Sequence, residues 1–144
     1  NVQISHLWLI TFSVLSYLFA AVNGCWSVVQ AVKTKVKKLG TLLSLSDIAS
    51  QAHEKVQLDF EHVNPVISVM QGMRKAGIPA DVMTIDCLAS KKRILIVLHD
   101  QLPDVIRYQF TSSDVEPGDD YEQSASADVT SEAVYGWIKD YFTS

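Results

Sequence analysis

The sequence predicts an α/β (α+β) protein, with an N-terminal transmembrane helix followed by a small two-layer domain in which helices pack on a three-stranded antiparallel meander. Three observations lead to this prediction. Residues 1–32 contain no Asp, Glu, Lys or Arg. Three short apolar runs lie between residues 82 and 111, and helical apolar patterns lie on both sides of them. A chain of 144 residues is long enough for one modest domain beside such a segment.

Composition and charge exclude several classes of protein. Apolar residues make up 48% of the chain and charged residues 19%, so the chain can bury enough surface to fold. Two cysteines, Cys25 and Cys87, are too few for a disulfide scaffold. The net charge of −4 argues against a nucleic-acid partner. The charge is uneven, because residues 114–144 hold 8 acidic side chains against Lys139 alone.

The first segment, residues 1–32, is predicted to be a transmembrane helix with its interface. An uncharged run of this length crosses a hydrocarbon core of roughly 30 Å as a helix. Trp8 and Trp26 lie about 27 Å apart along such a helix, which places them at the two membrane interfaces. The alternative is a helix buried in a soluble core, but no second helix of similar hydrophobicity follows for it to pack against.

The lysines after this segment predict its orientation. Four of them follow the apolar run directly, and such a cluster stays on the cytoplasmic side. We therefore expect a single-pass protein of a bacterial inner (cytoplasmic) membrane, with the N-terminus outside and the C-terminal domain in the cytosol. Cleavage and export are the alternative, although a signal peptide carries its positive charges before the apolar run. The predicted membrane-interface residues are Trp8, Trp26, Lys33, Lys35, Lys37 and Lys38.

Residues 33–62 are predicted to form a basic juxtamembrane segment and a connector helix. Ser46 is the expected N-cap, with Asp47 beside the positive end of the helix dipole. One narrow apolar stripe follows at intervals of four residues: Ile48, Ala52, Val56 and Phe60. This stripe suits either a connector between membrane and domain or a seam that pairs with another copy.

Residues 63–144 are predicted to form the cytosolic α-β-β-β-α domain, and its first element is a helix over residues 64–76. Asn64 is the expected N-cap and Pro65 suits the first helical position. Gly77 and Pro79 end the helix. Its predicted buried face consists of Val66, Val69, Met70 and Met73.

Three strands should follow, over residues 82–88, 93–99 and 104–111. The middle run, residues 94–98, is apolar on both faces, which marks a central strand covered on two sides. Short polar turns predict hairpins, and therefore an antiparallel meander. An acidic loop over residues 112–129 leads to a final helix capped by Thr130. That helix should dock on the meander and cover one face, while the 64–76 helix covers the other.

No arrangement of residues predicts catalysis, a cofactor or a metal. Cys87 and His99 fall at opposite ends of a hairpin, too far apart for a nucleophile and its base. The pairs His53-Glu54 and Glu61-His62 point to opposite sides of a continuous helix. The glycines form no phosphate-binding loop. We therefore expect no enzyme, and no catalytic, cofactor-binding or metal-binding residue.

The function predicted from these features is protein–protein interaction or assembly, by a domain anchored in the lipid bilayer. The partner is another protein or a further copy of the chain. The expected contact residues are Lys91, Lys92, Arg93, Trp137 and Tyr141. Two alternatives stay open: a small-ligand sensor or enzyme with a pocket between helix and sheet, and a structural component of a membrane-bound complex or virion.

Overall fold

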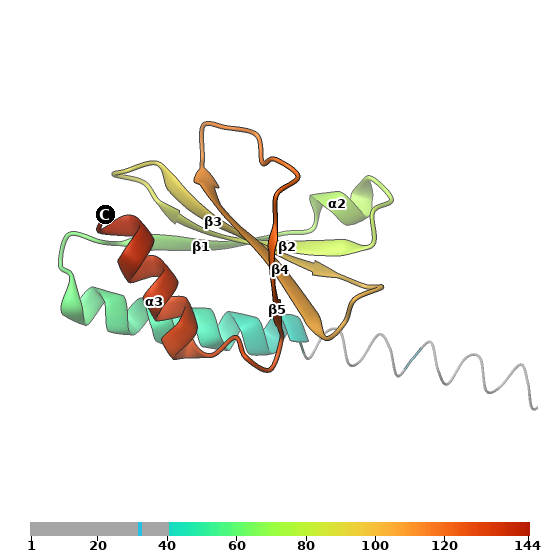
Figure 1. The fold of residues 1–144 in the computed structure, drawn as a ribbon, viewed down its shortest axis with the longest axis horizontal. Coiled ribbons are helices and arrows are strands. Elements are labelled where there is room, and N and C mark those ends of the chain that lie inside the picture. Colours follow the sequence, from blue (N-terminus) through green and yellow to red (C-terminus); the bar gives the residue numbers. More distant parts are fainter. Residues whose placement is uncertain (1–31, 33–40) are drawn as a thin grey trace, which may run out of the picture. The chain divides into compact units, whose positions relative to one another are not determined.

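The computed structural model describes Val32 and residues 41–144. The chain divides into two compact units, Asn1–Lys37 and Lys38–Ser144. In the second unit, the described residues form an α+β domain built on a five-stranded antiparallel sheet (Figure 1). No helix of the described residues is both long enough and apolar enough to cross a membrane. The predicted transmembrane segment and all six predicted membrane-interface residues lie outside the described residues.

The sheet is a meander, because its strand order follows the sequence. Each strand pairs antiparallel with the next. The three predicted strands are present as β2, β3 and β4, and two further strands extend the sheet, one on each side. The strands are β1 (Pro65–Met70), β2 (Ala80–Cys87), β3 (Lys92–His99), β4 (Val105–Ser112) and β5 (Glu122–Ala125).

The middle strand β3 is apolar on both faces, as predicted. Ile94 and Ile96 are fully buried toward the helices, and Leu95 is buried on the opposite side. Such a strand is typical of the centre of a sheet.

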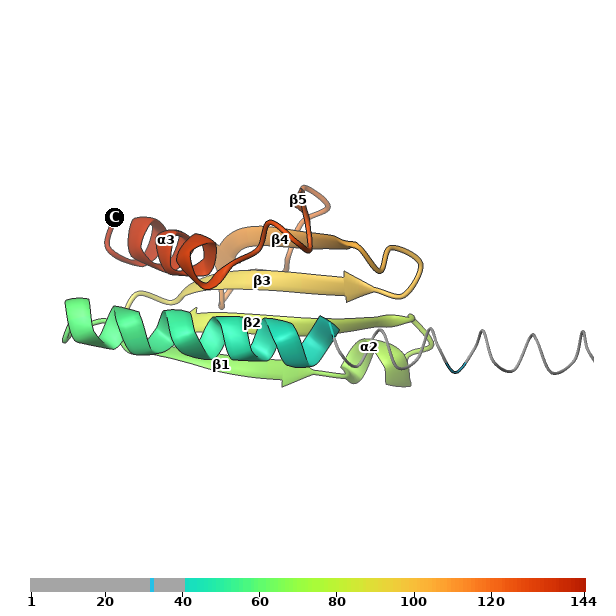
Figure 2. The same ribbon diagram turned by 90° about the horizontal axis from the view of Figure 1, so that it is seen from below.

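Both main helices pack on one face of the sheet. These are the helix over residues 41–59 and α3 (Ser131–Phe142), which Figures 1 and 2 show on the same side of the strands. The expectation of one helix on each face is therefore wrong. The core between the layers is formed by side chains of both helices and of the three central strands, among them Leu45, Ala49, Val56, Met83, Ile85, Ile94, Ile96, Ile106, Val134, Ile138 and Phe142.

The helix over residues 41–59 is a layer of this domain. Ala52 and Val56 of the predicted stripe are buried in the core, so the stripe faces the chain's own sheet. Ser46 does not cap the helix: it lies inside it, and its Oγ donates a hydrogen bond to the carbonyl oxygen of Leu42 at 2.9 Å. A serine within a helix commonly makes this bond one turn back, because its hydroxyl reaches that carbonyl.

The predicted helix over residues 64–76 is wrong in its first half. Residues 65–70 form β1, and only the one-turn helix α2 (Gly72–Lys75) follows. The run Val66-Ile67-Ser68-Val69 is rich in β-branched residues, which favour strands, and Pro65 is tolerated at the start of an edge strand. Pairing with β2 then decides between the two structures. The predicted end of the helix is correct, because Gly77, which follows the C-cap residue Ala76 of α2, has a φ of 84°.

The terminal helix was predicted correctly. The Thr130 hydroxyl accepts a hydrogen bond from the Ala133 amide at 3.2 Å and caps α3. Trp137 stacks on Tyr108 of β4 with ring centroids 4.3 Å apart. The Tyr141 hydroxyl donates to the carbonyl oxygen of Thr111 at 2.8 Å. The helix therefore docks on the meander.

The face of the sheet that carries neither main helix is called the open face here. Residues 113–121 fold back over its β4 side: the Gln109 amide donates to the Asp120 carbonyl at 2.9 Å, and the Arg107 guanidinium lies 4.9 Å from the centre of the Tyr121 ring. The predicted acidic loop is therefore ordered around β5. The β5 sequence Glu-Gln-Ser-Ala has no alternation of apolar and polar residues that would predict a strand. Backbone pairing with β4 holds it in place instead.

Candidate functional site

The candidate site lies along β1, the strand at one edge of the sheet. β1 pairs with β2 on one side and has no strand of the described residues on its other side. An edge strand presents unpaired N–H and C=O groups, which another strand can bind. The long apolar side chains of β1 are also exposed: Val66 by 41%, Val69 by 43% and Met70 by 45%.

Apolar exposure continues from β1 into α2 and the segment after it. Met73 and Ile78 are both partly exposed, and they lie within eight residues of Met70 in the chain. Other exposed large apolar side chains of the described residues, such as Leu58 and Val115, lie outside β1, α2 and the segment that follows α2. The group formed by Val66, Ser68, Val69, Met70, Met73 and Ile78 is called the β1 edge surface.

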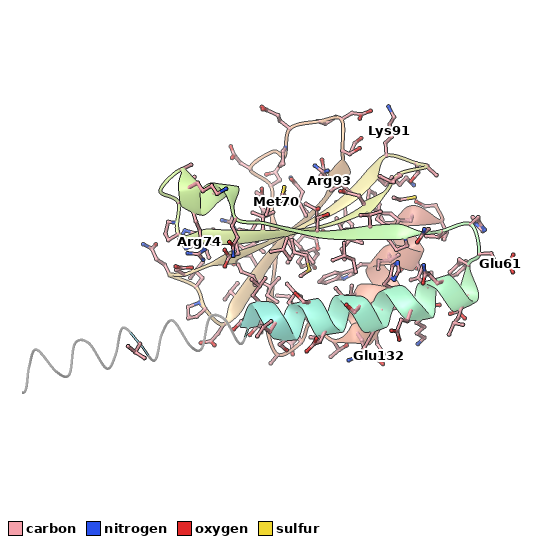
Figure 3. The ribbon with its side chains drawn as sticks, turned by 180° about the vertical axis from the view of Figure 1, so that it is seen from behind. Glu61, Met70, Arg74, Lys91, Arg93 and Glu132 are labelled. Atoms are coloured by element: carbon pink, nitrogen blue, oxygen red, sulfur yellow. The ribbon has the colours of Figure 1, made fainter. Side chains whose placement is uncertain are left out.

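The register of the sheet sets the surroundings of this surface. On the open face Val66 lies opposite Asp86, Ser68 opposite Thr84, and Met70 opposite Val82. Figure 3 shows Met70 and Arg93 on the side of the strands that points away from helix 41–59. A second chain at this edge would therefore meet apolar side chains flanked by polar groups.

One of these polar groups is the ion pair between Asp86 and Arg93. Arg93 donates from Nε to Asp86 Oδ1 at 2.6 Å and from Nη2 to Oδ2 at 3.1 Å. This bidentate contact raises the pKa of Arg93 above its ordinary value. Because Asp86 and Arg93 face each other on neighbouring strands, the pair fixes the β2–β3 register beside the edge surface.

A second ion cluster holds α2 against the sheet. Arg74 donates from Nη2 to Asp81 Oδ2 and to Asp100 Oδ1, both at 2.9 Å. Partial burial lowers the pKa of Arg74, but the hydrogen bonds and charges of the two carboxylates outweigh it, so the pKa lies above its ordinary value. Asp81 is almost fully buried, so its carboxylate depends on this cation. The cluster thereby keeps Met73 and Ile78 at the end of β1.

The predicted basic tip is already bound within the domain. Lys91 forms an ion pair with Asp114 at 2.7 Å, which raises the pKa of Lys91. Lys92 donates to the carbonyl oxygen of Tyr141 at 2.9 Å, and Arg93 pairs with Asp86. The three side chains therefore point to three different partners. Contact with another protein through them stays a prediction.

Trp137 and Tyr141, the other predicted contact residues, lie on the core side of α3. Phe110 of β4 contacts both: its ring centroid is 6.4 Å from that of Trp137 and 5.1 Å from that of Tyr141. Both side chains remain partly exposed. The structure places them far along the sheet from β1, since they meet β4.

The polar residues considered for catalysis or metal binding do not converge. In the β2–β3 ladder Cys87 lies opposite Lys92, whereas His99 lies opposite Ala80 at the other end. Among residues 41–144 and Val32, no group of three or more His, Cys, Asp or Glu side chains is arranged to hold a metal ion.

The β1 edge surface was missed from the sequence because its residues were assigned to a buried helix face. The signal that could have found it is the β-branched run directly after Pro65. Comparison with known proteins adds no relative: no protein-family model, no curated protein and no solved structure matches the chain.

Proposed function

We propose that this protein is a membrane-anchored interaction or assembly module, and that its β1 edge surface binds an extended segment of a protein partner. The observation that supports this proposal most directly is the coincidence of an unpaired strand edge with the main group of exposed apolar side chains in the domain. An unpaired edge offers main-chain hydrogen bonds, and exposed side chains beside it add specificity.

The chemistry of such binding follows from β geometry. A segment added to β1 would place alternate side chains on the two faces of the sheet. On the open face they would meet Val66 and Met70, and on the helix face they would meet Val69. The preferred segment therefore has apolar residues near its middle on both faces. Pro65 has no N–H to donate, so it limits the pairing at one end.

A double substitution tests this proposal. Val66→Lys with Met70→Lys in the full-length protein puts two charges on the edge without touching the core. We expect it to abolish co-purification of the partner from gently solubilised membranes, since charged side chains on an edge strand block pairing. The retained fold would be checked by circular dichroism.

The matched control is Leu58→Lys with Val115→Lys, which changes two exposed apolar residues outside β1 and β2. Capture should persist in this control. If the β1 double variant is folded and retains its partner, the edge is not the binding site and the proposal is wrong.

We also propose that residues 2–22 anchor the domain and that the domain lies in the cytosol. The four lysines that follow the apolar segment support this orientation. Alkaline phosphatase fused after Ser144 should then be inactive, and a fluorescent protein fused there should fluoresce. Active phosphatase with a dark fluorescent protein would show that the domain is exported.

A further inference from the structure

We infer that the partner segment is β1 of a second copy of this chain, paired antiparallel about Ser68. This inference rests on the proposed function of the β1 edge and names its partner. A symmetric pair of this kind needs a strand whose exposed side chains match when the strand is turned end to end, because both copies offer the same surface.

The side chains of β1 meet this requirement. When two β1 strands lie antiparallel with Ser68 opposite Ser68 of the second copy, Val66 lies opposite Met70 on the open face. On the helix face Ile67 lies opposite Val69. Each exposed apolar side chain of β1 therefore gains an apolar cross-strand neighbour. The one exposed polar side chain of β1, Ser68, lies opposite Ser68 of the second copy.

The charges at the ends of β1 are complementary in the same arrangement. Glu61 lies before β1 and Lys75 lies after it, and both are exposed. Figure 3 shows Glu61 and the α2 residue Arg74 at opposite ends of the strand. Antiparallel pairing brings Glu61 of one copy toward Lys75 of the other at both ends of the interface, whereas Arg74 is already paired with Asp81 and Asp100. Parallel pairing would instead bring like charges together.

The helix beside the edge also suits a second copy. The amide of Gln57 donates to Asn64 Oδ1 at 2.9 Å, so this flank of helix 41–59 faces the start of β1. At 100° per residue the same flank carries Leu43, Ser46, Ser50 and His53, and Glu54 lies at its border, about 60° from Gln57. The other charged residues of the helix, Asp47, Lys55 and Asp59, lie further round it. The part of this flank around Gln57 therefore carries no formal charge that would repel the same helix of a second copy.

Disulfide cross-linking of the full-length protein in membranes tests the register. In a Cys25→Ser background, Ser68→Cys should form a disulfide-linked dimer on mild oxidation, because directly opposite residues lie about 4.5–5.5 Å apart. Val66→Cys alone should not, since the two Val66 positions are offset by about 14 Å along the strands. Val66→Cys mixed with Met70→Cys should give the heterodimer. Val115→Cys, an exposed position in the loop between β4 and β5, measures random collision.

Charge exchange at the same residue provides a second test. Ser68→Lys places two like charges opposite each other and should weaken the dimer up to about fivefold. Ser68→Glu should do the same. Mixing the two variants should restore association, as measured by light scattering in detergent, because Lys then faces Glu. Only a site that pairs with itself gives this pattern.

The outcomes separate this inference from the proposed function. If Ser68→Cys cross-links no more than Val115→Cys, or if Val66→Cys alone cross-links as well as Ser68→Cys, the self-pairing is overturned. In that case the proposed function stands if the Val66→Lys, Met70→Lys variant no longer co-purifies with a different protein that the unchanged chain captures. If those two lysines change no association of any kind, both are wrong.

Discussion

Deletion of residues 130–144 should unfold the domain. Three side chains of α3, Val134, Ile138 and Phe142, are buried in the core between helix and sheet. Burial of each contributes about 1.5–3 kcal/mol, so together they approach the total stability of a small domain, about 5–15 kcal/mol. Without α3 the aromatic side chains of β4 would also face water, because Tyr108 and Phe110 contact Trp137.

The measurement uses residues 38–144, in which Trp137 is the only tryptophan. In the intact fragment its emission should be blue-shifted and protected from iodide. The deleted fragment should lose its strand and helix circular dichroism and the dispersion of its amide resonances. The control is Lys139→Ala with Asp140→Ala, two exposed positions of the same helix. A deleted fragment that keeps a dispersed spectrum would show that α3 is detachable.

Ile96→Ala should lower the free energy of unfolding by about 2–5 kcal/mol. Ile96 is fully buried at the middle of the central strand, where its neighbours cannot close the cavity left by the lost side chain. Urea denaturation of residues 38–144, followed by Trp137 fluorescence, measures the loss. Val115→Ala at an exposed position is the control and should change stability by less than about 0.5 kcal/mol. A loss below about 1 kcal/mol for Ile96→Ala would contradict the central place of β3.

The parts of the fold predicted from sequence are those in which the local pattern and tertiary packing agree. The run over residues 94–98 is apolar on both faces and lies at the centre of the sheet. Thr130 caps a helix whose apolar residues recur at helical spacing, and α3 forms there. In both cases the sequence contains the signals for the element and for its burial.

The parts that were missed depend on partners distant in sequence. Residues 64–70 carry a helix-start signal and a β-branched run together, and only pairing of Ile67 with Ile85 selects the strand. Residues 122–125 are polar and become a strand because β4 lies beside them. The β1 edge surface was missed for the same reason. Once β1 was assigned to a helix, its exposed apolar side chains were interpreted as core.

Every strand of the sheet pairs with its neighbour in the sequence, and this order influences how the chain folds as it is synthesised. Hairpins such as β2–β3 close short loops, so they form within microseconds and need no distant residue. The helix over residues 41–59 precedes the sheet and can dock as soon as β2 and β3 exist. α3 emerges last among the described elements, so Tyr108 and Phe110 stay uncovered until then. During that interval the apolar surface of β4 is open to a chaperone or to a neighbouring nascent chain.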